Sequence, residues 1–458
     1  MNHNSIKRRQ LLRNSIYSAL VGSVRASVIG VPASFLVNGK VLAQTSSARF
    51  TILAQSASGE SQSLNGPGSY GAGAASLVEH PRASQLGADV LGSVGGTSYR
   101  AADFENGASL QLGKQRVLAS KPWQGLPSGF LNNLACVWYR TGSNAHPEFP
   151  SVRRLQGALR SDKRSNLDEE LASAIALENA AALGTSLKTP LLLDGNGFSE
   201  GNPLTVYEAE NLKELFVGSA SSLNPELYDE LYNQTINEVY KNLKANGSPK
   251  QRAFLDNHAL TRSQAADFGQ DLGDALSDIK GNDLRDQFRA ATTFIKLKVS
   301  PVVVVSHNFG RDNHADSELE REARSTLSSL DALSQYWTFI NDLGIQDQVN
   351  FATLDCFGRT PFRNKEGGRD HYGNMTLGLV HGSNIQGGMI GGLEVQKNNR
   401  PAATGINSTD GSTDKPDIEA SSTLSAYGKT LMKSAGISDE RLDVRVPSAR
   451  VISALLNS

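Results

Sequence analysis

Cysteine is scarce in this chain: Cys136 and Cys356 are the only two among 458 residues. At most one disulfide can form between them, and the sequence leaves open whether they pair. This scarcity excludes a small fold that is held together by a disulfide framework. The hydrophobic content of 39% indicates a fold with an ordinary apolar core instead.

The N-terminal region lacks acidic residues, because none precedes Glu60. Within it, residues 7–13 read Lys-Arg-Arg-Gln-Leu-Leu-Arg and closely resemble a twin-arginine export signal. Residues 16–37 are apolar but are interrupted by an arginine, two glycines and a proline. No uninterrupted apolar stretch within it approaches the roughly 18 residues that cross a bilayer, so we expect the core of a signal peptide and no transmembrane anchor.

A candidate cleavage site follows this apolar segment. Val41 and Ala43 suit the minus-three and minus-one positions of a signal peptidase site, which predicts a mature start at Gln44. Residues 1–43 would then be a twin-arginine signal peptide, with the twin-arginine translocase as partner and a periplasmic or secreted destination. The alternative is a basic N-terminal helix that is never cleaved.

Removal of this segment makes the chain more acidic. Cleavage takes away six basic side chains and no acidic one, which moves the formal charge from −1 to −7. A mildly acidic mature chain has no electrostatic reason to bind nucleic acid or an anionic membrane. We expect residues 44–458 to form a single α/β domain, because no convincing linker divides them.

Short β-like runs alternate with longer helical patterns, which is typical of an α/β protein. The expected strands are residues 50–54, 134–139, 190–193, 294–306 and 349–354. The expected helices are residues 167–183, 206–217, 224–245, 262–276, 317–343 and 418–434. The continuous apolar run 301–305 favours a strand covered on both faces. The prediction is a three-layer sandwich with a central, mostly parallel sheet.

Side chains able to carry chemistry gather in three loops of the C-terminal half. Residues 307–316 and 355–361 each follow an expected strand, and residues 367–373 come shortly afterwards. Loops at strand ends are where α/β proteins place ligand and metal sites, because the sheet fixes their geometry. Carboxylates and imidazoles from the three loops could therefore converge on one divalent cation.

Asp312 and His314 are two residues apart, so their side chains point to the same side in an extended loop. Together they could contribute an oxygen and a nitrogen ligand to zinc. The alternative is that Asp316 and Ser317 cap the following helix and that the histidines are hydrogen-bonded loop residues. The residues alone leave both interpretations open.

The order of motifs resembles the C-terminal signature of a bacterial exported family called domain of unknown function 1501, which is related to the alkaline phosphatase and sulfatase superfamily. The motifs are Gly-Arg-Asp-Asn-His at 310–314, Phe-Gly-Arg-Thr-Pro at 357–361, Gly-Gly-Arg-Asp-His at 367–371 and Ile-Gln-Gly-Gly-Met-Ile-Gly at 385–391. The resemblance is looser at 134–146, where a strand leads to a histidine. It implies an alkaline-phosphatase-like fold.

The resemblance also implies a metal site. Asp312, His314 and His371 stand where the superfamily binds divalent metal, with Asp370 beside them. Zinc is the metal that we expect, because imidazole nitrogen and carboxylate oxygen both suit it.

Two positions depart from the family pattern. Asp355 and Cys356 stand where relatives have Ser-Glu and where alkaline phosphatases have an Asp-His ligand pair. A Cys356 thiolate would bind zinc well and magnesium or calcium poorly. After the first strand, relatives have Gly-Gly-x-Asp, whereas residues 58–62 read Ser-Gly-Glu-Ser-Gln and leave Glu60 as the only replacement.

The reaction implied by the resemblance is hydrolysis of a small phosphate or sulfate ester. Thr141 or Ser143, just after a strand, is the candidate nucleophile. Arg311, Arg359 or Arg369 could hold the anion by a bidentate contact, and Arg359 is the one that we assign to the site. The alternative is a catalytically impaired relative that acts as a binding or assembly component of the cell envelope.

Overall fold

The computed structural model describes residues 47–55, 64–156, 167, 169–185, 187–211, 241, 276–307, 309, 312–397 and 399–457. The expected signal peptide, Glu60, Arg311 and most of the expected helices between 206 and 276 lie outside the described residues. The chain divides into two compact units, one of residues 46–209 and 281–458 and the other of residues 1–45 and 210–280. We call the first the sheet unit, because it contains the central sheet described below.

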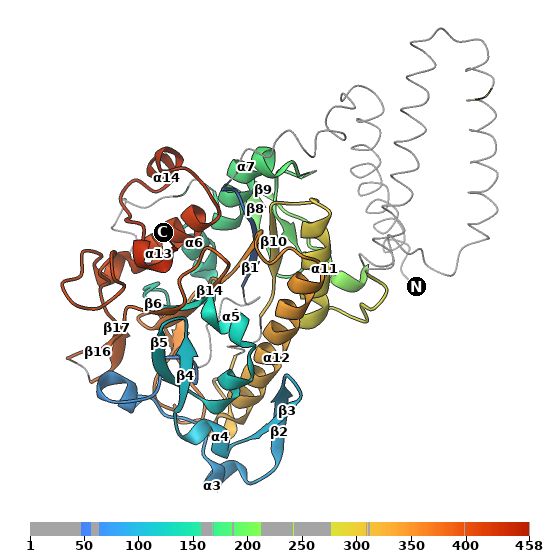
Figure 1. Cartoon of the computed structure of the whole chain (residues 1–458). Coiled ribbons are helices and arrows are strands. Elements are labelled where there is room, and N and C mark those ends of the chain that lie inside the picture. The colour runs from blue at the N-terminus through green and yellow to red at the C-terminus, as the bar shows by residue number, and fades with distance from the viewer. Residues whose placement is uncertain are drawn as a thin grey trace. The chain divides into compact units, whose positions relative to one another are not determined.

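A seven-stranded sheet forms the centre of the sheet unit, in the order β15-β6-β14-β11-β1-β10-β7 (Figure 1). Its strands are β1 (Phe50–Ala54), β6 (Leu134–Tyr139), β7 (Leu191–Leu192), β10 (Val302–Val305), β11 (Val349–Thr353), β14 (Thr376–His381) and β15 (Gly388–Ile390). β14 is antiparallel to β11 and β6, and the other neighbouring strands pair in parallel. The predicted mostly parallel α/β sheet is confirmed.

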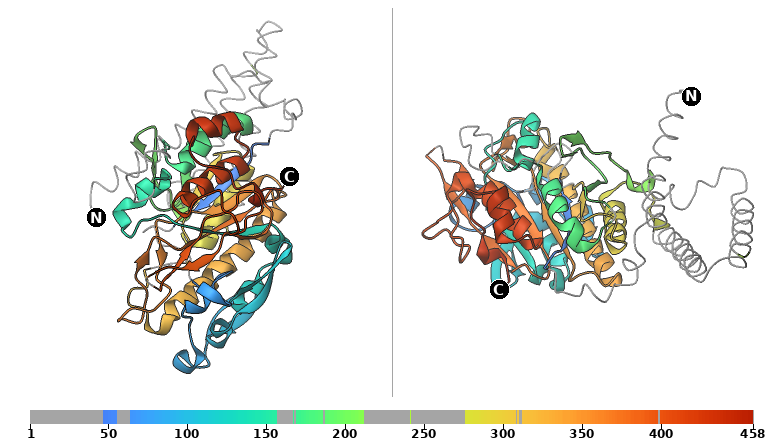
Figure 2. Two further views of the ribbon diagram at one scale, coloured as in Figure 1. Left: turned by 90° about the vertical axis from the view of Figure 1, so that its left-hand side faces the viewer. Right: turned by 90° about the horizontal axis from the view of Figure 1, so that it is seen from above.

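Helices pack on both faces of this sheet (Figure 2). The longer ones are α7 (Leu171–Leu183), α11 (Leu284–Lys296), α12 (Glu320–Asp342), α13 (Thr423–Ser434) and α14 (Asp439–Arg445). Leu53 and Val304 point into the buried cluster formed with α7 and α13. Phe351 points to the opposite face, where its ring centroid lies 5.8 Å from Phe288 of α11 and 5.6 Å from Tyr336 of α12.

Shorter elements surround these layers. The short helices are α3 (Ala83–Leu86), α4 (Ala102–Glu105), α5 (Ser128–Asn132) and α6 (Phe149–Arg153). The paired short strands are β2 (Val90–Val94) with β3 (Thr97–Arg100), β4 (Ala108–Leu112) with β5 (Gln115–Ala119), β8 (Phe198–Ser199) with β9 (Asn202–Pro203), β12 (Gly358–Arg359) with β13 (His371–Tyr372), and β16 (Leu393–Val395) with β17 (Pro401–Ala403). None of the helices in the described part of the chain is long and apolar enough to cross a membrane.

The prediction of a strand over residues 294–306 is wrong in its first half. Residues up to Lys296 belong to α11, whose N-terminus is capped by Asp283 through a hydrogen bond from the Asp286 amide. The apolar residues of α11 face the sheet at helical spacing, whereas residues 296–300, between its last turn and β10, read Lys-Leu-Lys-Val-Ser and alternate as a strand would. Periodicity alone therefore merged the end of a helix with the strand that follows it.

The parallel strands place three loops at one edge of the sheet. β10 and β11 both pair in parallel with β1, so their carboxyl ends, followed by His307 and Asp355, open at the same edge. β6 runs in the same direction, because β14 is antiparallel to both β6 and β11. The loop from Thr141 therefore joins them at the edge where we expected the site.

Candidate functional site

His307 and Asp355 form a buried pair across the carboxyl end of β1. His307 Nε2 lies 2.7 Å from Asp355 Oδ1, and the two side chains are 1% and 0% exposed. β1 lies between the strands that carry them, so the pair bridges the carboxyl end of the central strand. The other ring nitrogen of His307, Nδ1, is buried and has no hydrogen-bond partner within the described residues. Asp355 is thus directed toward His307.

Cys356 points away from that pair. Its Sγ lies 3.1 Å from Ser143 Oγ and 3.5 Å from the carbonyl oxygen of Ala145. Burial raises the pKa of the Cys356 thiol to about 12, so these contacts are those of a protonated thiol. Cys136 is buried too, and neither cysteine is in a disulfide.

The two candidate nucleophiles are also buried. Thr141 Oγ1 accepts a hydrogen bond of 3.2 Å from the Ser143 amide and lies 3.4 Å from the Gly373 carbonyl oxygen. Ser143 Oγ contacts Cys356 and the backbone of Ala145. Both hydroxyls therefore stabilise the turn after β6 in this arrangement.

Three histidines from three loops meet just outside this buried layer. The ring centroid of His371 lies 4.7 Å from that of His146 and 4.6 Å from that of His314. Phe357 stacks on the His371 ring at a centroid distance of 4.0 Å and fixes its plane. We call His146, His314 and His371 the imidazole cluster.

Hydrogen bonds orient two rings of the imidazole cluster. His371 Nδ1 donates to the Asn144 carbonyl oxygen at 2.8 Å, and His314 Nδ1 donates to Asp370 Oδ1 at 3.2 Å. In the neutral rings, Nε2 is then the nitrogen with a free lone pair. His371 Nε2 is buried without a hydrogen-bond partner among the described residues. Burial, with the nearby charge of Arg359, lowers the pKa of His371 and favours its neutral form.

Two carboxylates stand beside these rings. Asp312 Oδ1 accepts from the His314 amide at 3.2 Å, lies 3.9 Å from His314 Nε2 and is 3.7 Å from Arg359 Nη2. Asp370 accepts a hydrogen bond of 2.9 Å from Asn364, which lowers the pKa of its carboxyl together with the His314 contact. The structure thus brings together four predicted ligands: Asp312, His314, Asp370 and His371.

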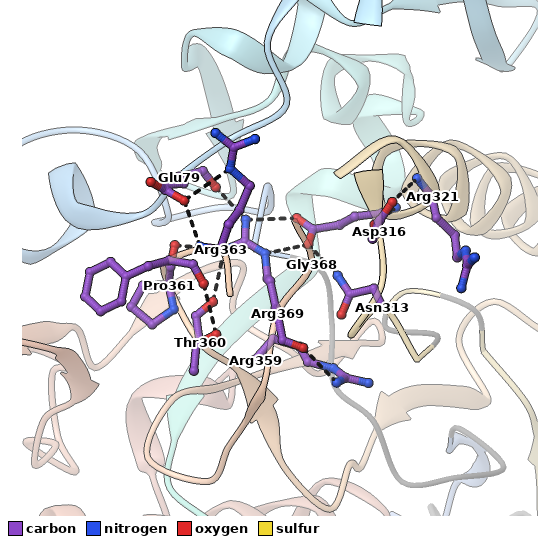
Figure 3. Close-up of polar contacts among 12 residues, drawn as sticks. Glu79, Asn313, Asp316, Arg321, Arg359, Thr360, Pro361, Arg363, Gly368 and Arg369 are labelled. Carbon is purple, nitrogen blue, oxygen red and sulfur yellow. Dashed lines mark hydrogen bonds and ion pairs between the residues drawn. The ribbon is translucent and has the colours of Figure 1, made fainter. Parts of the chain in front are cut away.

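Arg369 stands in a network of polar contacts with neighbouring loop residues (Figure 3). We call this network the framework. Its guanidinium is fully buried, with Nε at 2.6 Å from Glu322 Oε2 and Nη1 donating to the Thr360 and Pro361 carbonyls at 2.9 and 2.8 Å. Its backbone amide donates to the carbonyl of Asn313. These contacts join the loop of His314 to the loop of His371. Arg359 is the better candidate to hold an anion, because its guanidinium lies beside Asp312 and the imidazole cluster, whereas that of Arg369 is held by the framework.

The donor set fits zinc in its chemistry, since it offers imidazole nitrogens and carboxylate oxygens. In a histidine that binds a metal, one ring nitrogen usually donates to a carbonyl or carboxylate and the other faces the metal. His371 has this arrangement, because its Nδ1 donates to the Asn144 carbonyl and its Nε2 has no hydrogen-bond partner among the described residues. The geometry is not that of a closed site: within the described residues, no three His, Cys, Asp or Glu side chains are already arranged to hold a metal ion. Asp312 lies beside Arg359, so a cation would have to draw this carboxylate away from the guanidinium.

Residues 286–412 match the model of a family described as a protein of unknown function, DUF1501. The predicted resemblance is confirmed over these residues, which include every proposed site residue from Asp312 to His371. Thr141, Ser143 and His146 lie outside the match. No curated protein matches the chain.

Sequence reasoning did not assign His146 or His307 to the site. Both stand in loops that follow strands of the central sheet, at the same edge as the residues that were assigned. Their position after strands of the sheet was the sequence signal from which both could have been assigned to the site. What the sequence could not provide was the pairing of His307 with Asp355 and the contact of His146 with His371.

Proposed function

We propose that this chain is an exported, metal-dependent hydrolase of small phosphate or sulfate monoesters with an alkaline-phosphatase-like arrangement of its site. The observation that carries the proposal is the orientation of His371. Its Nδ1 is held by the Asn144 carbonyl, its Nε2 has no hydrogen-bond partner among the described residues, and two further imidazoles lie against it. Such a ring is prepared to bind a cation.

In this proposal His314, His371 and Asp312 would hold the metal, with zinc as the best match to their chemistry, and Asp370 would orient His314. When bound, the cation would stabilise the negative charge that develops on the ester. Asp370 holds His314 through Nδ1 at 3.2 Å, which keeps Nε2 available.

Arg359 would orient the ester anion. Its guanidinium is buried, donates to the Arg369 carbonyl at 3.2 Å and lies 3.7 Å from Asp312. A buried, planar guanidinium can make two parallel hydrogen bonds to a phosphate or sulfate. Because Thr141 and Ser143 are buried and bonded within their turn, the geometry favours water over either hydroxyl as the nucleophile.

The direct test is metal analysis and turnover of the wild-type protein. We expect stoichiometric zinc in protein purified from zinc-supplemented medium, and hydrolysis of 4-nitrophenyl phosphate or 4-nitrophenyl sulfate that is abolished by a chelator and restored by zinc. Folded protein that remains free of metal and inert toward both esters would refute the hydrolase.

That outcome would favour the second candidate, a catalytically impaired relative with a binding or assembly role in the cell envelope. Two observations support it. Cys356 is directed at Ser143 rather than into the imidazole cluster, and the carboxylates beside the cluster are already paired with His314 and Arg359.

Export through the twin-arginine route is part of the proposal and has its own test. Arg8→Lys combined with Arg9→Lys should leave uncleaved precursor in the cytoplasm, because the translocase recognises the arginine pair. Fractionation and N-terminal sequencing would show this, with Lys7→Arg as a control that preserves the pair. Normal processing of the double variant would contradict the route.

A further inference from the structure

An open pocket of about 580 Å³ adjoins the imidazole cluster, because His314 and Asp370 form part of its wall. Most of the remaining wall comes from residues 360–366, in the loop after β12, and Arg400 completes it just before β17. A volume of this size suits a small-molecule ligand. A substrate that reacts at the cluster can therefore extend into this pocket.

The wall of the pocket mixes both signs of charge with neutral polar groups. Arg363, Lys365 and Arg400 are cationic, whereas Glu366 and Asp370 are acidic. Thr360 and Asn364 add a hydroxyl and an amide, and Phe362 contributes a phenyl ring. The wall thus offers both donors and acceptors of hydrogen bonds to a ligand in the pocket.

Two of the charged groups are available to a ligand. Arg363 is already held by Glu79 at 3.3 Å and by Glu318. Lys365 and Glu366, in contrast, are exposed and form no ion pair with any residue that the structure describes. They are adjacent in sequence and contribute one strong donor and one strong acceptor.

We propose that this pocket binds the alcohol half of the ester, and that this half is polyhydroxylated, as in a sugar. The inference rests on the proposed hydrolase function and specifies its substrate class. Hydroxyl groups can donate to Glu366 and accept from Lys365 at once. A hydrocarbon alcohol would desolvate these two groups without replacing their hydrogen bonds.

The test compares two esters and three variants. Glucose 6-phosphate supplies the polyhydroxylated alcohol and phenyl phosphate the apolar one. Lys365→Met and Glu366→Met should each lower kcat/KM for glucose 6-phosphate about tenfold, mainly through KM, since a hydrogen bond to a charged group is lost. Both variants should leave phenyl phosphate hydrolysis unchanged. Lys114→Met, at the exposed turn between β4 and β5, is the matched control and should change neither.

Calorimetric titration of the same proteins with both esters gives a readout without turnover. The wild type should bind glucose 6-phosphate more tightly than phenyl phosphate, and Lys365→Met and Glu366→Met should remove most of that preference. If neither ester is hydrolysed but the preference is present, the hydrolase fails and the sugar pocket stands. Equal binding of both esters by the wild type, or equal losses for both in the variants, would overturn the pocket.

Discussion

Replacement of Arg369 by methionine is expected to lower the free energy of unfolding by about 3–5 kcal/mol, because it leaves the Glu322 carboxylate buried without its cation. The guanidinium and the carboxylate are 0% and 3% exposed, so solvent cannot replace the lost contact. The carbonyls of Thr360 and Pro361 lose their donor at the same time. Urea unfolding followed by circular dichroism measures the loss.

Arg450→Met is the matched control for this prediction. Arg450 lies 2.8 Å from Asp417, but its side chain is 66% exposed, so the variant should lose no more than about 1 kcal/mol. The double variant Arg369→Met with Glu322→Met should be more stable than Arg369→Met alone, because no unpaired charge remains buried. Equal, small losses in Arg369→Met and Arg450→Met would show that the buried pair has no special role.

His314→Ala is expected to abolish stoichiometric zinc binding and to lower ester hydrolysis by more than the roughly 10–100-fold that loss of an outer-shell partner causes. The reason is that too few donors remain in a small coordination shell once Nε2 of His314 is removed. Elemental analysis and 4-nitrophenyl ester assays on the same preparation measure both effects.

Cys356→Ser distinguishes a ligand from a buried thiol in the same experiment. The contacts of Sγ with Ser143 and Ala145 favour retention of zinc in this variant. Loss of zinc in Cys356→Ser would instead support the sequence-based prediction that the thiolate is a ligand. Retention of full zinc content by His314→Ala would remove His314 from the proposed site.

The sheet was predictable where a strand is a continuous apolar run. Residues 50–54 and 134–139 were predicted with the bounds that β1 and β6 have. β14 was not predicted, since Gly378 interrupts its pattern. In the fold that glycine is required: a Cβ there would lie 2.7 Å from the Tyr427 ring, which packs on the strand. The residue that weakens the strand in the sequence is the one that lets α13 approach it.

The edge of the sheet at which the site lies was predictable from the positions of the loops. Loop position indicated where a site would lie, the family resemblance assigned Asp312, His314, Asp370 and His371 to it, and the structure places these four side chains close together. His146 was not assigned to the site, because its contact with His371 depends on backbone hydrogen bonds between the two loops that carry them. The amides of Thr141 and Gly142 both donate to the Gly373 carbonyl at 2.9 Å. No side-chain pattern reports such a contact.

The central position of β1 also governs when the fold can be completed. Thr51 pairs with Val302 on one side and with Asn350 on the other, so both neighbours of this strand are synthesised long after it. Pairings between residues so distant in the chain make a sheet slow to form, because long loops must close first. A truncated chain that ends before β10 would present to solvent both edges of β1, whose five residues are all buried in the fold. Such a fragment is expected to aggregate instead of folding in part.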